Sequence, residues 1–133
     1  MIITLDEIYT VFPKHDIERL FNGKVNKSPR NKIYKRLVES VNRQEGVVRE
    51  YLGKIANWDE GVPETVKWCI SARVAWELCF HGDLPEIKEK YKLLLDEAAK
   101  MLKAYKDGTI SRNETNLTVR ISRRRNTQRF NWG

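Results

Sequence analysis

The last fourteen residues, RISRRRNTQRFNWG (Arg120 to Gly133), contain five arginines, no acidic residue and two aromatic residues, Phe130 and Trp132. An arginine guanidinium forms paired hydrogen bonds with a phosphate or a carboxylate, because its planar donors match both groups. Aromatic rings can stack on nucleic-acid bases or fill a pocket on another protein. The segment therefore predicts either binding to a nucleic-acid backbone or docking onto a protein. A third interpretation is a basic terminus that only aids solubility.

The residues just before this tail alternate between apolar and polar side chains in the segment NLTVRIS. This alternation predicts a β-strand with its apolar side chains on one face. A single strand cannot satisfy its own backbone hydrogen bonds, and no other segment strongly indicates a strand. Docking onto another chain supplies a partner strand, whereas purely electrostatic binding needs none. Protein docking is therefore favoured, and the candidate partner-binding residues are Leu117, Val119, Arg120, Ile121, Arg123, Arg124, Arg125, Arg129, Phe130 and Trp132.

The net charge of +7 is unevenly placed along the chain. Residues 120–133 carry five arginines and no acid, hence +5, which leaves +2 for the first 119 residues. A folded surface that follows DNA or RNA usually carries its own basic excess. The first 119 residues are nearly neutral, so they do not predict a folded surface that follows DNA or RNA. The length of 133 residues and the hydrophobic content of 41% are typical of one soluble globular domain.

The remaining residues indicate neither catalysis nor metal binding. The sequence has no phosphate-binding loop, dinucleotide-binding loop, zinc-protease motif or serine-hydrolase motif. Cys69 and Cys79 would lie about 15 Å apart along one helix, too far for a disulfide. There is no CxxC pair, and the histidines are His15 and His81, so no zinc site is expected. We predict a protein that is not an enzyme and that binds no cofactor or metal.

Large side chains in the middle of the chain are predicted to be structural. Trp68 and Trp76 are eight residues apart, on nearly the same side of a helix, and are expected in the core together with the two cysteines. Trp58 falls in a predicted loop and is a candidate exposed contact.

Two short helices are predicted at the N-terminus. Thr4 and Glu7 have the spacing of a capping box, which would start a helix that runs to about Val11. Pro13 ends this helix. A second helix follows over HDIERLFNG, with Asp16 as its expected cap and the Asn-Gly pair at residues 22–23 as its end.

A longer helix is predicted to start at Ser28, which can cap it, with Pro29 in the first turn. Gly46 interrupts its interior and predicts a bend or a close helix contact. Its apolar stripe extends over more than 20 residues and consists of Ile33, Leu37, Val41, Val48, Leu52 and Ile55.

Two further helices complete the prediction. Pro63 opens a helix over VKWCISARVAWELCF, which is apolar nearly all round and is therefore expected at the centre of a bundle. The last helix begins near Pro85 and ends at Gly108, with one apolar face and a predicted surface ion pair between Glu86 and Lys90.

Together these patterns predict an all-α protein, a helical bundle of two short and three longer helices with an extended C-terminal arm that contains a possible β-strand. Residues 1–108 are predicted to form the bundle and residues 109–133 the basic arm. No apolar run approaches the length of a membrane span, and the N-terminal segment MIITLDEIYTVF lacks the basic leader of a secretion signal. We therefore expect a cytosolic protein without membrane contact.

Several segments follow one another in a distinctive order: ITLDEIYTVFP, DIERLF, VVREYLGKI, VPETVKWCISARVAWELCF and EIKEKYKLLLDEAAKMLKAYKDGTIS. This order resembles the Mu-type small phage neck proteins, often described only as phage proteins of unknown function. That family also ends its last helix with a glycine and a short polar step, here KDGTIS. The likeness covers most of residues 3–112. The family is similar in turn to the helical head–tail adaptors and head-completion proteins of long-tailed phages.

The resemblance implies a non-enzymatic assembly protein that forms a ring on the portal and links head to tail. Its partners would be the portal protein, a tail-completion protein and further copies of itself, with incidental contact to DNA in the channel. It would lie in the host cytoplasm during assembly and then in the virion neck. Two alternatives remain open: a nucleic-acid-binding helical module that uses its Arg-rich arm, and a small helical scaffold unrelated to phages.

Overall fold

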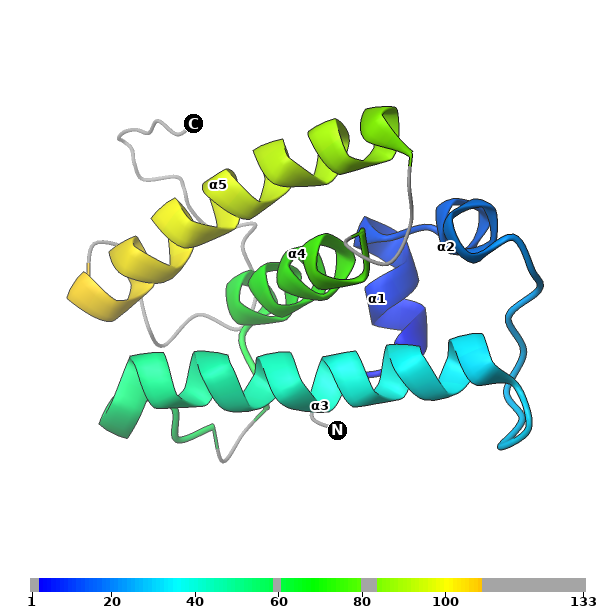
Figure 1. The fold of residues 1–133 in the computed structure, drawn as a ribbon. Coiled ribbons are helices and arrows are strands. Elements are labelled where there is room, and N and C mark those ends of the chain that lie inside the picture. Colours follow the sequence, from blue (N-terminus) through cyan, green and yellow to red (C-terminus); the bar gives the residue numbers. More distant parts are fainter. Residues whose placement is uncertain (1–2, 59–60, 80–83, 109–133) are drawn as a thin grey trace.

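The computed structural model describes residues 3–58, 61–79 and 84–108, and every regular element in these ranges is helical. The all-α prediction is thus confirmed for this part of the chain (Figure 1). None of its helices combines the length and apolar character that a membrane span requires. The elements in chain order are α1 (Leu5–Val11), α2 (Lys14–Phe21), α3 (Lys32–Leu52), the one-turn 3₁₀ helix η1 (Gly53–Ile55), α4 (Glu64–Cys79) and α5 (Pro85–Asp107).

Helix α4 lies at the centre of the molecule, between α3 on one side and α5 on the other (Figure 1). Helix α1 crosses against the same central helix. Ten of the 16 residues of α4 are buried, because its sequence offers water almost no polar face. The predicted central position is therefore confirmed. The two cysteines are free thiols buried in this core, as expected, and burial raises the pKa of Cys69 to about 12 and that of Cys79 to about 11.

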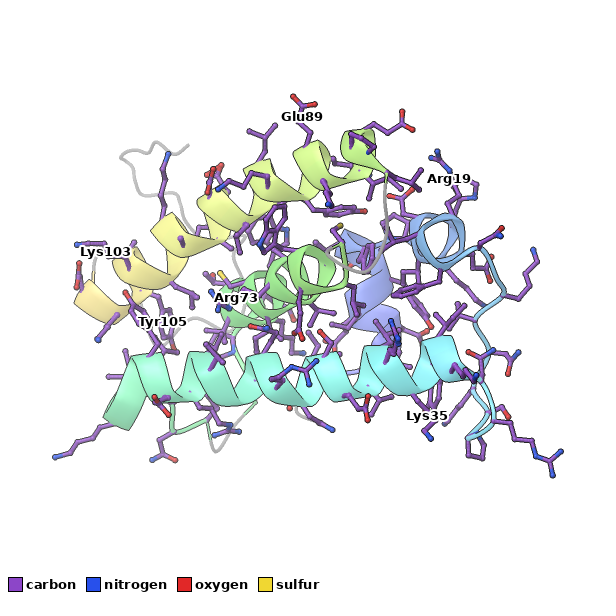
Figure 2. All side chains as sticks on the ribbon, in the orientation of Figure 1. Arg19, Lys35, Arg73, Glu89, Lys103 and Tyr105 are labelled. Carbon is purple, nitrogen blue, oxygen red and sulfur yellow. The ribbon has the colours of Figure 1, made fainter. Side chains whose placement is uncertain are left out.

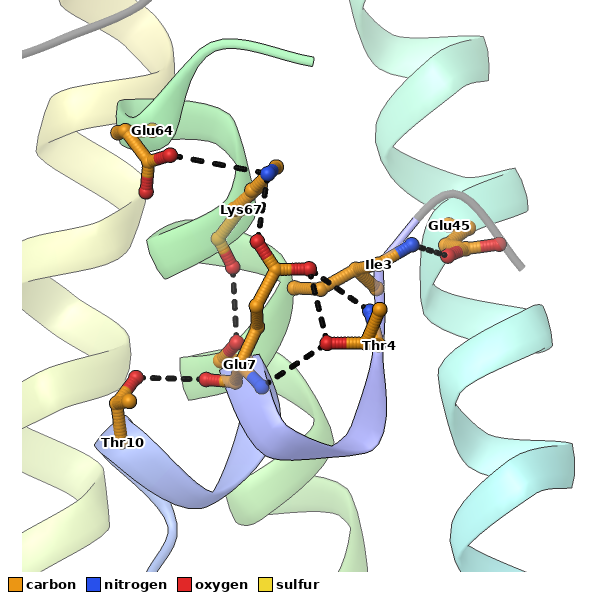
Figure 3. A network of polar contacts seen from close by, with 8 residues as sticks. Ile3, Thr4, Glu7, Thr10, Glu45, Glu64 and Lys67 are labelled. Carbon is orange, nitrogen blue, oxygen red and sulfur yellow. Dashed lines mark hydrogen bonds and ion pairs between the residues drawn. The ribbon is translucent and has the colours of Figure 1, made fainter. Parts of the chain in front are cut away.

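The capping box predicted at the start of α1 is present. The backbone N–H of Glu7 donates to the hydroxyl of Thr4, and the Glu7 carboxylate accepts from the backbone N–H of Thr4 (Figure 3). The preceding residue, Ile3, is buried, and its N–H donates to the Glu45 carboxylate of α3 at 3.1 Å. The N-terminal segment is thereby fastened to α3 as well as to α4.

The predicted cap of α2, Asp16, was wrong by three residues, because Pro13 occupies the cap position. The helix begins at Lys14, directly after Pro13, and no side chain caps it. Asp16 instead lies in the first turn, where its carboxylate accepts hydrogen bonds from the Tyr91 hydroxyl at 2.7 Å and from Lys90 Nζ at 3.1 Å. A buried tyrosine hydroxyl requires a partner, and α2 supplies it from 75 residues away in sequence.

Helix α3 starts later and ends earlier than its pattern predicted. Asn31, not Ser28, is the cap, because its side-chain oxygen accepts the N–H of Tyr34 at 2.8 Å. The helix ends where Gly53 takes a positive φ of 64°, which few other residues adopt, so Ile55 belongs to η1. Gly46 marks neither an interruption nor a close contact: α3 runs through it, and an added Cβ would meet nothing within 4 Å.

The ion pair predicted within α5 was also wrong. Lys90 binds Asp16, and Glu86 binds Arg19 at 3.4 Å, so both side chains reach α2 instead of each other. The i,i+4 spacing permits a pair on an isolated helix, but α2 lies alongside and offers partners of the opposite charge to both. These contacts hold α2 against the N-terminal part of α5.

We expect Ile70→Ala to lower the free energy of unfolding by about 2–5 kcal/mol, because it removes a fully buried side chain and leaves a cavity in α4. Urea unfolding followed by circular dichroism measures this change. Leu93→Ala is the control, since Leu93 is 68% exposed and its loss should change stability by less than about 0.5 kcal/mol. Equal effects of the two substitutions would contradict the central position of α4.

Candidate functional site

The ten candidate partner-binding residues between Leu117 and Trp132, and the predicted strand among them, lie outside the described residues. Their docking role therefore stays a prediction. Within the described residues, a groove of about 270 Å³ opens beside the central helix. Its lining comes from three helices: Val47, Val48 and Tyr51 of α3, Arg73 of α4, and Ala99 and Leu102 of α5.

The groove exposes apolar surface. Val47 is 44% exposed and Tyr51 is 41% exposed, and they stand one turn apart on α3, next to the buried Val48 and Leu52. On the opposite wall, the small side chain of Ala99 leaves space that a larger residue would fill. The volume lies just below the range of about 300–1,000 Å³ typical of small-molecule pockets. The groove therefore suits one or two side chains of a peptide better than a cofactor.

Arg73 is the charged residue in the groove, and α4 and α3 hold it in place together. Its Nε donates to the side-chain oxygen of Gln44 at 2.9 Å, and the Gln44 amide nitrogen donates to Glu77 at 2.7 Å. Glu77 is in turn bound by Arg43 and by the Ser40 hydroxyl. The central position of Arg73, between α3 and α5, is visible in Figure 2.

Glu77 anchors this network as a carboxylate. Burial raises its pKa, but the hydrogen bonds donated by Gln44, Arg43 and Ser40 together outweigh burial, so the pKa lies below its ordinary value. Glu77 is therefore ionised at neutral pH, and its carboxylate oxygens accept hydrogen bonds from side chains of α3. Within the described part of the chain, no carboxylate forms an ion pair with Arg73. A guanidinium carries five N–H donors, and among the described residues only the Nε of Arg73 donates a hydrogen bond. Arg73 can therefore bind a carboxylate that belongs to another segment or another chain.

One end of the groove is bounded by a cation–π contact. Lys106 Nζ, on the last turn of α5, lies 4.4 Å from the centre of the Tyr51 ring on α3. This contact joins the C-terminal ends of the two helices. It lies between the groove and Gly108, the residue at which α5 ends with φ of 83°.

A second hollow, of about 250 Å³, lies between α1 and α4, but its charged groups satisfy one another. Lys67 Nζ lies 2.5 Å from Glu7 and 3.7 Å from Glu64 (Figure 3). The hydrogen bond from Lys67, together with those from Thr4, lowers the pKa of Glu7 despite partial burial. These contacts fasten α1 to α4, so we assign this hollow a structural role.

Of the three tryptophans in the described residues, two lie where they were predicted and one does not. Trp68 and Trp76 are half-buried against the core, as expected. Trp58, the candidate exposed contact, is not free: its Nε1 donates to the Tyr105 hydroxyl at 3.3 Å, and the Arg49 guanidinium lies 5.1 Å from its ring centre. That prediction was wrong, because the loop after η1 packs back onto the bundle. The described residues contain no group of three side chains that could bind a metal ion.

The groove was not predicted from the sequence, although one of its lining residues stands out in the sequence. Arg73 is the single charged residue in the otherwise apolar stretch WCISARVAW, where a buried helix disfavours charge. That anomaly singles out Arg73. Nothing in the sequence says that Val47 and Ala99, from two other helices, lie beside it.

We expect Glu77→Gln to lower stability by about 1–3 kcal/mol at neutral pH, because it weakens charge-assisted hydrogen bonds at the α3–α4 contact. A carboxylate with a depressed pKa stabilises the fold above its unfolded-state pKa, about 4.3 for glutamate. This stability disappears as the pH falls through the lower folded-state value. The difference between the two proteins should therefore shrink below about pH 4. Urea unfolding at several pH values measures it.

Glu89→Gln, at an exposed carboxylate on α5, is the matched control (Figure 2). It should leave stability unchanged within about 0.5 kcal/mol at neutral pH. A Glu77→Gln deficit that stays constant down to pH 2 would contradict the ionised network.

Comparison of the chain with protein-family models, with curated proteins and with solved structures gave no match.

Proposed function

We propose that this protein is a non-enzymatic head–tail adaptor of a phage or prophage, which assembles as a ring on the portal and links head to tail. The observation that carries the proposal is the groove between α3 and α5. It combines exposed Val47 and Tyr51 with an arginine that is oriented by its own subunit. Apolar surface beside a guanidinium that is already held in position is typical of a protein-docking site, since aromatic residues and arginine are enriched at interfaces.

The order of helices supports the same proposal, because it follows the pattern of small phage neck proteins described above. The groove and the basic arm are different surfaces of one chain. A contact between two different surfaces of identical subunits is head-to-tail, and such contacts generate rings when the rotation closes. Because a ring on a portal engages many contacts at once, a modest affinity for each subunit is sufficient.

The proposal assigns the partners as the portal protein, a tail-completion protein and further copies of this chain. The protein would lie in the host cytoplasm during assembly and in the virion neck afterwards. Contact with DNA in the channel would be incidental, because the first 119 residues carry only +2 of the net charge. Docking would use the arm residues Arg123, Arg124, Arg125, Phe130 and Trp132 among the ten candidates.

Binding to nucleic acid is the second candidate function, and the five arginines of residues 120–133 favour it. In that case the arm would neutralise phosphates, and the helical body would act only as a carrier. The two functions differ in partner and in salt dependence.

Full-length protein is expected to bind portal rings encoded in the same genome and to sediment with them. The triple variant Arg123→Ser, Arg124→Ser and Arg125→Ser should bind roughly tenfold or more weakly, because charge-assisted contacts to carboxylates are lost. Sedimentation velocity of the mixture measures the bound fraction.

A variant with three exposed body lysines replaced by serine, Lys14, Lys27 and Lys32, removes the same charge and is the control. Its portal binding should match that of the unmodified protein. Absence of portal binding by the full-length chain at any concentration would overturn the adaptor proposal.

Duplex DNA is expected to bind only weakly and at low salt. Fluorescence anisotropy over a salt series tests this, because each phosphate contact adds about −0.9 to the log–log slope. Tight binding with a slope near about −4.5, as for five phosphate contacts, would favour the nucleic-acid function instead.

A further inference from the structure

We infer that the groove between α3 and α5 receives residues 114–121 from the arm of a second copy of this chain, with the Glu114 carboxylate bound to Arg73. The inference rests on the proposed ring and deepens it by naming the contact between neighbours. This contact joins the guanidinium of Arg73, which its own subunit already holds in position, to a segment of the arm that contains an acidic residue and apolar residues.

Charge complementarity selects the segment. Glu114 is the only acidic residue among residues 109–133, and every other charged residue there is an arginine. Arg73 is held through Gln44 and Glu77 and forms no ion pair with any carboxylate that the structure describes. The remainder of the arm would repel Arg73, so Glu114 sets the register in which the arm can lie.

The apolar side chains fit the same register. Leu117 follows Glu114 by three residues, which span about 10 Å at most in an extended chain. Side chains three apart in a strand point to opposite faces, but Glu114 precedes the predicted strand. A turn of the chain between residues 114 and 117 can therefore place Glu114 at Arg73 and Leu117 on the exposed side chains of Val47 and Tyr51. A groove of about 270 Å³ accommodates one or two side chains of this size and would be filled by them.

Distance alone would also let the arm of the same subunit reach the groove. Ala99 lies nine residues before Gly108, about 13.5 Å along α5, whereas the six residues from Gly108 to Glu114 can span about 20 Å. The proposed ring favours the arm of a neighbour, because a contact between the groove of one subunit and the arm of the next is the head-to-tail contact that generates a ring.

Preorganisation makes the site suitable for a weak, repeated contact. Hydrogen bonds from Arg73 to Gln44 and from Gln44 to Glu77 restrict the arginine rotamers before any partner arrives. Less side-chain entropy is then lost on binding.

Disulfide trapping between two full-length copies tests the inference. One copy carries Val47→Cys and the other carries Leu117→Cys, so a bond between these positions joins two chains. The native Cys69 and Cys79 are buried, and their raised pKa keeps them unreactive at neutral pH. We expect trapped dimers at least about tenfold above the yield with Leu93→Cys as the body position. Leu93 is 68% exposed and lies on a different face of α5 from Ala99.

A charge exchange tests the register. Arg73→Glu in the first copy or Glu114→Arg in the second should reduce trapping about tenfold, and the two together should restore it. Lys35→Glu in the first copy is the matched control, since it reverses an exposed charge at the other end of α3 (Figure 2). Equal trapping by all combinations would overturn the pairing of Glu114 with Arg73.

A single chain that carries both Val47→Cys and Leu117→Cys distinguishes the two routes. Fast formation of an internal disulfide at high dilution, with no trapping between copies, would show that the arm covers its own groove and would overturn the inference. Portal binding separates this result from the proposed function. Portal binding that survives without trapping leaves the adaptor intact and removes the groove contact. Trapping without portal binding would support the groove contact and overturn the adaptor proposal.

Discussion

Burial of the apolar residues of α4 is the constraint on which the rest of the structure depends. Its residues are apolar on nearly every side, so no orientation on the surface of a protein would satisfy it. The chain must surround it, and α1, α3 and α5 each contribute an apolar stripe to the same continuous core. The neighbouring helices are amphipathic because each has one side toward α4 and another toward water. The bundle is thus organised around one helix instead of around pairs.

Polar contacts at the edges of this core set the positions of the surrounding helices. Asp16 accepts the buried Tyr91 hydroxyl and joins α2 to α5, and Glu77 gathers donors from α3. Lys67 and Glu7 do the same for α1. Each contact satisfies a polar group that apolar packing alone would leave without a partner. The hydrophobic core therefore decides that the helices pack, while these contacts decide where along their lengths they meet.

The groove is a consequence of the same arrangement. Since α3 and α5 both pack on α4, their outer edges face each other across a gap that neither fills, and Arg73 of α4 lies between them. The network that fixes α3 on α4 also orients this arginine. Arg73 thus belongs both to this structural network and to the groove, which gives the proposed ring contact a receiving side chain that its own subunit already holds in position.

Within the described residues, the sequence by itself determined the all-α class, the order of the five α-helices, the capping box of Thr4 and the central place of α4. These follow from local spacing, because hydrophobic periodicity and capping depend on residues within a turn or two. Tertiary structure alone decided that Asp16 binds Tyr91, that Trp58 packs back onto Tyr105 and that Val47, Arg73 and Ala99 form one groove. Those contacts join residues far apart in the chain, and their partners are chosen by how the helices pack, which no local pattern encodes.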